Sequence, residues 1–129
     1  EKEFDLGSVR KPTKREFEDL TIAWIVWKHV KSNAITFVKD GVLVGMGAGQ
    51  PNRVGSAKIS GEAAQNKAIG AAAASDALIP FPDTIEVCAE YGVSCLVHTG
   101  GSIRDSESIE IANKLNLSFF TSGIRHFSH

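Results

Sequence analysis

Two short apolar runs that meet at an Asp-Gly pair constrain the fold of this chain more than any other feature. Residues 34–38 and 42–46 are rich in β-branched and aliphatic side chains, and they flank Lys39-Asp40-Gly41. Asp and Gly tolerate the positive φ angles of a two-residue hairpin turn. The pattern therefore predicts a β-hairpin over residues 34–46.

Helical and strand-like patterns surround this hairpin. Thr13 and Glu16 form a capping-box pair before a stretch with apolar residues at helical spacing, which predicts a helix over residues 14–31 with one broad buried face. Residues 1–12, with Gly7 and Pro12 among charges, are expected to form a leading arm or linker. After the hairpin we expect helices over 53–74, from 83 or 84 to before Gly92, and over 106–115, and strands over 93–97 and 117–121.

The resulting order, α-β-β-α-α-β-α-β, predicts an α/β fold. One hairpin followed by β-α-β crossovers implies a mixed sheet with helices on both faces, which is a three-layer αβα arrangement. Ligands of such sheets bind where the strands deliver their C-terminal loops. Here these loops are residues 47–52, 98–102 and 121–129, all rich in glycine or polar residues.

Composition excludes several classes of partner. The formal net charge of −1 provides no overall field that would attract nucleic acid or an anionic membrane. No apolar run approaches the roughly 20 residues that span a bilayer. Cys88 and Cys95 lack a Cys-x-x-Cys or histidine pattern, which favours two reduced thiols and a cytoplasmic protein over a disulfide.

Several short motifs are candidates for chemistry, and each has a plain structural alternative. Lys28-His29 would suit proton transfer, or would simply place cations at a helix C-terminus. The glycines before Arg53 would offer N–H groups to an anion, or would serve tight turns. Gly100-Gly101-Ser102 precedes a second helix start, whose free N–H groups would bind a ligand. The alternative is that Asp105 simply caps this helix, and the two roles are compatible. No His-x-Glu occurs with Cys-x-x-Cys, so the pattern of a zinc deaminase is missing.

Read in order, the motifs resemble the C-terminal half of the AICAR transformylase domain of the bifunctional purine-biosynthesis enzymes, whose other activity is IMP cyclohydrolase. The resemblance runs from about residue 8 to the C-terminus. The matching segments are 10–13, Trp24, 28–35, 45–50, Arg53-Val54, 74–77, 80–83, 100–105 and Arg125-His126-Phe127-Ser128-His129. The resemblance implies that residues 13–129 form one of two cytidine-deaminase-like halves.

The resemblance also implies a reaction, the transfer of a formyl group from 10-formyltetrahydrofolate to the 5-amino group of AICAR. That amine is a poor nucleophile because its lone pair is delocalised toward the neighbouring carboxamide. The family's catalytic Lys-His pair lies in a different motif of the first half, whereas Lys28-His29 is followed by Val30-Lys31-Ser32-Asn33. We therefore expect no catalytic residue in this chain, and we interpret Lys28 and His29 as structural or site-edge residues.

Carried over motif by motif, the family's ligand contacts fall on eleven positions. Leu78 stands where the family usually has phenylalanine, which puts packing against the ligand ring there in doubt. The implied AICAR contacts are Asn33, Arg53, Leu78 and Arg125, with Arg125 at the phosphate; the implied folate contacts are Val54, Asp83, Ser102 and Ile103; and a structural potassium site of some members lies near Ser32, Asp76 and His129.

The implied partners are AICAR, folate, the first half of the transformylase domain and a second copy in a homodimer. Nucleic acid, membranes and zinc are not expected. Two other classes of function stay open from the sequence alone. One is a non-catalytic module that binds nucleotide or folate, and the other is a structural half-domain that supports a dimer.

Overall fold

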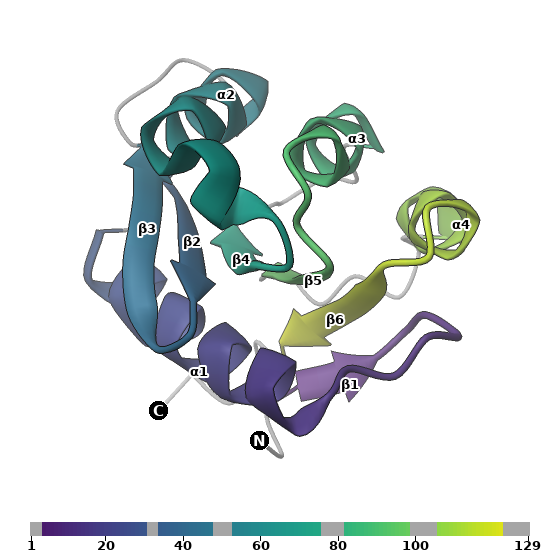
Figure 1. Ribbon diagram of the computed structural model, residues 1–129. Helices are drawn as coiled ribbons and strands as arrows, with labels where there is room; N and C mark the ends of the chain where they lie inside the picture. Colours follow the sequence, from purple (N-terminus) through teal and green to yellow (C-terminus); the bar gives the residue numbers. More distant parts are fainter. Residues whose placement is uncertain (1–3, 31–33, 48–52, 76–81, 99–105, 123–129) are drawn as a thin grey trace.

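The computed structural model describes residues 4–30, 34–47, 53–75, 82–98 and 106–122. Within these residues, a sheet lies between one helix on one face and three helices on the other (Figure 1). The strands are β1 (Phe4–Leu6), β2 (Ile35–Lys39), β3 (Val42–Gly47), β4 (Ala72–Ser75), β5 (Cys95–His98) and β6 (Ser118–Ser122). The helices are α1 (Lys14–Val30), α2 (Arg53–Ala64), the short 3-10 helix η1 (Gln65–Ala68), α3 (Pro82–Glu90) and α4 (Ser106–Lys114).

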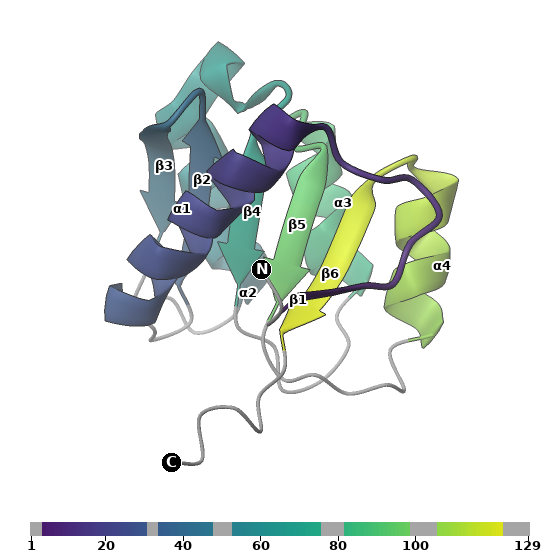
Figure 2. The same ribbon diagram turned by 90° about the horizontal axis from the view of Figure 1, so that it is seen from below.

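The six strands form one mixed sheet in the order β1-β6-β5-β4-β2-β3. β4, β5 and β6 run parallel, whereas β2 is antiparallel to both β3 and β4, and β1 is antiparallel to β6. α1 crosses one face, and α2, α3 and α4 cover the other (Figures 1 and 2). The predicted three-layer αβα arrangement with a mixed sheet is therefore confirmed.

α1 begins at the predicted capping box. The amide of Glu16 donates to Thr13 Oγ1 at 3.1 Å, and the amide of Thr13 donates to Glu16 Oε1 at 2.9 Å. These reciprocal bonds satisfy two N–H groups that a helix start leaves without intrahelical partners. The helix is described to Val30, and Lys31, the last residue of the predicted helix, lies outside the described residues.

The predicted hairpin is β2–β3, and its turn is Asp40-Gly41. Both residues have positive φ, 53° and 79°, as a two-residue hairpin turn requires. The buried carboxylate of Asp19 on α1 accepts both turn amides, from Asp40 at 2.9 Å and Gly41 at 2.8 Å. The hairpin is thus tied to the helix that precedes it.

The prediction of a single helix over residues 53–74 is wrong. α2 ends at Ala64, Gln65 adopts a positive φ of 55°, and the turn after η1 passes through Gly70 with a φ of 78°. Residues 71–75 are fully buried, and 72–75 form β4 in the middle of the sheet. Three alanines favour a helix locally, but a central strand covered by helices on both faces also suits small side chains, so tertiary context overrides propensity.

Residues 1–12, expected to form a leading arm, contain a strand that the sequence did not predict. β1 pairs with β6, and Gly7 N donates to Phe119 O at 2.8 Å. Farther along, Arg10 contacts the carboxylate of Glu16 at 2.8 and 3.0 Å and the hydroxyl of Ser118 at 2.8 Å. The arm is therefore part of the folded domain.

Alternate residues of the central strands supply two separate cores. Phe37, Ala73, Leu96 and Phe119 face α2, α3 and α4, whereas their neighbours Val38, Ala74, Val97 and Phe120 face α1. A sheet buried on both faces explains why its central strands are almost wholly apolar. Among the described residues, no helix is long and apolar enough to cross a membrane.

Candidate functional site

The ends of five strands meet at one edge of the sheet. Across this edge the backbone register places Gly47 beside Ile35, Ile35 beside Ser75, Ser75 beside His98, and His98 beside Thr121. β3, β4, β5 and β6 all end here, while the antiparallel β2 begins here (Figure 2). This is the edge at which ligands of open α/β sheets bind.

Three helices begin near the same edge. α2, α3 and α4 follow the C-terminal ends of β3, β4 and β5, so their N-termini point toward the edge and their C-termini away from it. The free N–H groups and the dipole of a helix N-terminus favour an anion or a carbonyl oxygen. α1 runs the other way and ends here with Lys28 and His29 in its last turn.

Three of the predicted site residues lie in the first turns of helices that begin at this edge. Arg53 and Val54 are the first two residues of α2, and Asp83 is the second residue of α3. The structure therefore brings these two helix starts to the same edge of the sheet. Outside the described residues lie Ser32, Asn33, Asp76, Leu78, Ser102, Ile103, Arg125 and His129.

Glycines of β3 set the position of α2, a feature that the sequence analysis missed. A Cβ atom on Gly45 would overlap the carbonyl oxygen of Ser60, and one on Gly47 would overlap that of Ser56. Ser60 Oγ also donates to Ile35 O at 2.8 Å. The backbone of β3 therefore packs directly on the backbone of α2, which holds the start of α2 against the edge. The sequence signal for this contact was the pair Gly45 and Gly47 in the strand, followed by Ser56 and Ser60 in the helix.

Lys28 and His29 make the contacts of an ordinary helix C-terminus. Lys28 Nζ lies 6.0 Å from the centroid of the Trp24 ring, within reach of a cation–π interaction. His29 Nδ1 is 2.9 Å from Ile25 O, one turn back along α1. Both side chains are exposed, and these contacts favour the structural interpretation of the pair.

Both cysteines are free thiols, as the sequence predicted. Each is buried, and burial raises the pKa of the Cys88 thiol to about 12 and also raises that of Cys95. A thiol that stays protonated is a poor nucleophile and a poor metal ligand. Neither cysteine is therefore a candidate for covalent chemistry.

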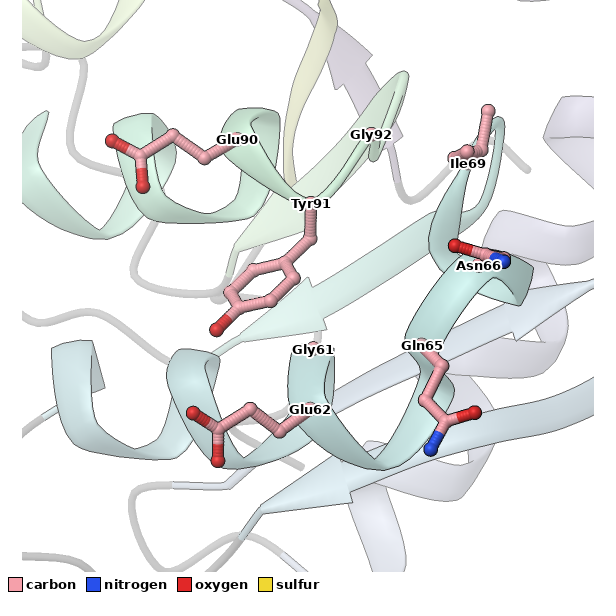
Figure 3. A pocket seen from close by; sticks show the side chains of 8 residues that line it. All are labelled: Gly61, Glu62, Gln65, Asn66, Ile69, Glu90, Tyr91 and Gly92. Carbon is pink, nitrogen blue, oxygen red and sulfur yellow. The ribbon is translucent and has the colours of Figure 1, made fainter.

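A cavity of about 500 Å³ lies at the other end of the helices (Figure 3). It is bounded by the end of α2, by η1 and by the turn after α3, and the Tyr91 ring packs on Gly61 at its wall. Glu62 and Glu90 bring carboxylates to it, and Gln65 and Asn66 bring carboxamides. The described residues that line it include none of the predicted site residues. Among the described residues, no group of three His, Cys, Asp or Glu side chains could hold a metal ion.

Comparison with known proteins relates the chain to one family of enzymes. Residues 1–63 match the family described as the AICARFT/IMPCHase bienzyme. The bifunctional purine biosynthesis protein PurH of Bacillus subtilis is 52% identical over 127 residues, which is 98% of this chain and 25% of that protein. PurH of Anoxybacillus flavithermus is 52% identical over 120 residues, or 93% of this chain and 24% of that protein.

The chain is homologous to part of PurH. It spans about a quarter of the length of these PurH relatives. An identity of about one residue in two over nearly the whole chain means that this chain and the matching part of PurH share one fold. The relatives are bifunctional enzymes of purine biosynthesis, as their name states.

Solved structures show the type of fold that this PurH-related chain adopts. RibD of Acinetobacter baumannii superposes with a TM-score of 0.62 at 16% identity, covering 88% of this chain and 37% of that chain. The dCMP deaminase of cyanophage S-TIM5 gives 0.57 at 13% identity, covering 84% and 98%. The fold is therefore cytidine-deaminase-like, as expected, and at these identities the likeness shows the fold alone.

Proposed function

We propose that this chain is the C-terminal, cytidine-deaminase-like half of an AICAR transformylase domain. In that role it contributes to formyl transfer from 10-formyltetrahydrofolate to AICAR in purine biosynthesis. The homology to PurH supports the assignment to a purine-biosynthesis enzyme. The observation that carries the proposal further is the shared sheet edge, at which the helices bearing Arg53, Val54 and Asp83 begin.

The proposed work of this half is to bind and orient. Asn33, Arg53, Leu78 and Arg125 would hold AICAR, and a carboxamide such as that of Asn33 pairs with the planar carboxamide of AICAR as both donor and acceptor. Val54, Asp83, Ser102 and Ile103 would hold the folate. Orientation matters here because a weak amine attacks the formyl carbon efficiently only when the two are held in contact.

The proton-transfer residues belong, in this proposal, to the other half of the domain. Lys28 and His29 are exposed and already engaged by Trp24 and Ile25, which supports a structural role. Ser32, Asp76 and His129 are proposed to lie near a potassium ion, since hydroxyl, carboxylate and carbonyl oxygens suit a hard cation. No zinc is proposed.

The test is a pair of measurements on the purified chain. AICAR titrated calorimetrically should bind, and Arg53→Ala or Arg125→Ala should weaken that binding at least tenfold, since a charge-assisted contact contributes ~1.5–3 kcal/mol. Lys58→Ala, on an exposed position of the same helix as Arg53, is the matched control and should bind as the parent does.

The same chain, assayed for formyl transfer, should be inactive. Activity of the isolated chain that is lost in Lys28→Ala or His29→Ala would contradict the placement of the proton-transfer pair outside it. Absence of any AICAR binding would contradict the proposed role as a whole. Addition of a Bacillus subtilis PurH lacking the matching quarter separates a catalytic half from a mere binding module, because only the former restores transfer.

A further inference from the structure

The cavity at the ends of α2 and α3 is lined by polar side chains that the described fold leaves without partners. Its volume of about 500 Å³ is within the range of small-molecule sites. Five polar side chains line it, those of Glu62, Gln65, Asn66, Glu90 and Tyr91 (Figure 3). The described residues supply no hydrogen-bond or ion-pair partner to any of the five. Their donors and acceptors are therefore available to a ligand that displaces water from the cavity.

The lining of this cavity is negatively charged. Glu62 and Glu90 contribute two carboxylates, and the described lining residues include no Lys, Arg or His. Lys58 on α2 and Lys67 on η1 are exposed, and neither lines the cavity. Because a carboxylate is an acceptor only, this lining favours a ligand that brings positive charge and N–H donors.

The two helices that end at the cavity carry an unusual charge in their last turns. A helix C-terminus bears a partial negative charge and favours basic side chains. α1 and α4 follow this rule, with Lys28 and His29 in the last turn of one and Lys114 in that of the other. α2 and α3 have no basic residue in the last turn and place Glu62 and Glu90 there instead. Two carboxylates and two helix C-termini therefore add their negative charges at one place, which a bound cation would neutralise.

Backbone contacts fix the walls of the cavity. The Tyr91 ring lies on Gly61, where a Cβ atom would overlap the ring. Gly70 N donates to Gly92 O at 2.7 Å, which joins the turn after η1 to the turn after α3. Gly92 has a φ of 104°, and a Cβ atom there would come within 2.7 Å of Ile69 Cα. The cavity is thus a property of the folded backbone, and the Tyr91 ring in its wall offers an aromatic surface to a cation.

We propose that this cavity binds a small organic dication of the guanidino-amine class. In Figure 3 the carboxylates of Glu62 and Glu90 lie on the side toward which the Tyr91 hydroxyl points, and the carboxamides of Gln65 and Asn66 lie on the other. A planar guanidinium has five N–H donors and suits the two carboxylates, while an ammonium group suits the carboxamide oxygens. Two positive charges balance the two carboxylates.

This site goes beyond the proposed transformylase role and uses no residue assigned to AICAR or folate. α2 begins at the ligand edge with Arg53 and ends at the cavity, so the two sites lie at opposite ends of one helix. Binding of the dication and binding of AICAR are therefore separate measurements, and either proposal can fail alone.

Calorimetric titration of agmatine, a guanidino-amine, into the purified chain is the first test. We expect one saturable site with a dissociation constant of about 0.1–1 mM, since each partly exposed ion pair contributes little. Glu62→Gln and Glu90→Gln should each raise that constant about threefold to tenfold. Glu86→Gln, exposed on α3 and outside the lining, is the matched control and should bind as the parent does. Absence of saturable binding up to about 10 mM, or equal weakening by all three substitutions at unchanged circular dichroism, would overturn the proposal.

A second titration distinguishes a free dication from an arginine side chain of another protein. Nα-acetyl-arginine amide carries the same guanidinium without the second charge, so it should bind about threefold or more weakly than agmatine. Equal affinity for the two compounds would overturn the assignment to a dication, and would point to a protein side chain as the natural occupant.

The remaining titrations test the ring and the organic nature of the ligand. Tyr91→Phe keeps the ring and should bind agmatine to within about threefold of the parent, whereas Tyr91→Leu should bind more weakly than Tyr91→Phe. Mg²⁺ at matched ionic strength should not displace agmatine, because two carboxylates alone provide fewer oxygen ligands than such an ion needs. Displacement by Mg²⁺ would overturn the choice of an organic ligand, and equal binding by the two Tyr91 variants would overturn the contact with the ring.

Discussion

The two faces of the sheet hold their helices in opposite ways. On one face, α1 is the one helix among the described residues, and large aromatic rings hold it: Trp24 stacks on Trp27 at 5.2 Å and meets Phe4 edge-on at 5.7 Å. On the other face α2 meets the sheet through glycine, serine and alanine, close enough that Gly45 and Gly47 admit no side chain. Both arrangements bury the sheet, but the face covered by α2 has less room for a larger side chain than the face covered by α1.

The difference follows from what each face has to position. The backbone-close packing of α2 fixes the place of its first residues, Arg53 and Val54, relative to the sheet edge. Under α1, large aromatic side chains fill the volume between the helix and the strands. Functional sites benefit from rigid support, which the face of small residues supplies.

Removal of an aromatic anchor under α1 should have the largest effect. Trp24 is 3% exposed, and Trp24→Ala should lower the free energy of unfolding by about 3–5 kcal/mol through lost burial and a cavity. Ile25, next to Trp24, is half-exposed, so Ile25→Ala is the matched control and should lower the free energy of unfolding by less than about 1 kcal/mol. Urea unfolding measures the free energy of unfolding of both variants. Similar costs for the two substitutions would mean that the rings do not anchor α1.

The next largest effect should come from adding a single methyl group on the opposite face of the sheet. Gly45→Ala drives a Cβ into the Ser60 carbonyl, and backbone cannot move aside as a side chain can, so we expect a loss of about 2–3 kcal/mol. Gly41→Asn is the control, because a Cβ there meets nothing within 4 Å and Asn tolerates a φ of 79°. An unfolding free energy for Gly45→Ala close to that of the parent would show that α2 is not packed so tightly.

The helices and strands of the molecule were unequally predictable from the sequence. The capping box and the apolar spacing predicted α1 over all of its described length, and Asp40-Gly41 predicted the hairpin, because both signals are local. β4 was missed because three alanines carry no strand propensity, and only the helices above and below explain a strand there. β1 was missed because a three-residue edge strand depends on its partner β6 rather than on its own sequence.

For the candidate site, periodicity located the edge but not its ligands. The loops after β3, β5 and β6 were predicted to converge there, and the register shows that these three strands end at the same edge of the sheet. The loop after β4 did not emerge from periodicity, because β4 itself had been placed in a helix. The roles of Asn33, Arg53 and the other contacts rest on resemblance, since spacing alone cannot distinguish a ligand contact from a cap, and those roles stay predictions.

The polar anchors of α1 should contribute less than its rings. Asp19 is buried and accepts the amides of Asp40 and Gly41, so Asp19→Asn turns one acceptor into a donor that faces an N–H group. We expect a loss of about 1–2 kcal/mol in urea unfolding. Glu62→Gln, an exposed carboxylate on α2, is the comparison and should change stability by less than about 0.5 kcal/mol. If the two changes cost the same, the hairpin turn does not depend on α1.

The smallest effect should be a pH dependence at the start of α1. Burial alone would raise the pKa of Glu16, but hydrogen bonds from Arg10, Ser94 and Thr13 lower it below its usual value of 4.5. A carboxyl whose pKa is lower in the folded state stabilises the fold above its unfolded pKa and loses that contribution as the pH falls through the folded pKa. The gap in unfolding free energy between the parent and Glu16→Gln should therefore be about 1 kcal/mol near pH 7 and should narrow as the pH falls below 4.5 and through the lowered pKa of the folded state. Glu107 is exposed on α4, so Glu107→Gln should differ from the parent in unfolding free energy by close to zero at both neutral and acid pH. If the difference for Glu16→Gln did not narrow in acid, the charge of Glu16 would not hold residues 1–12 to α1.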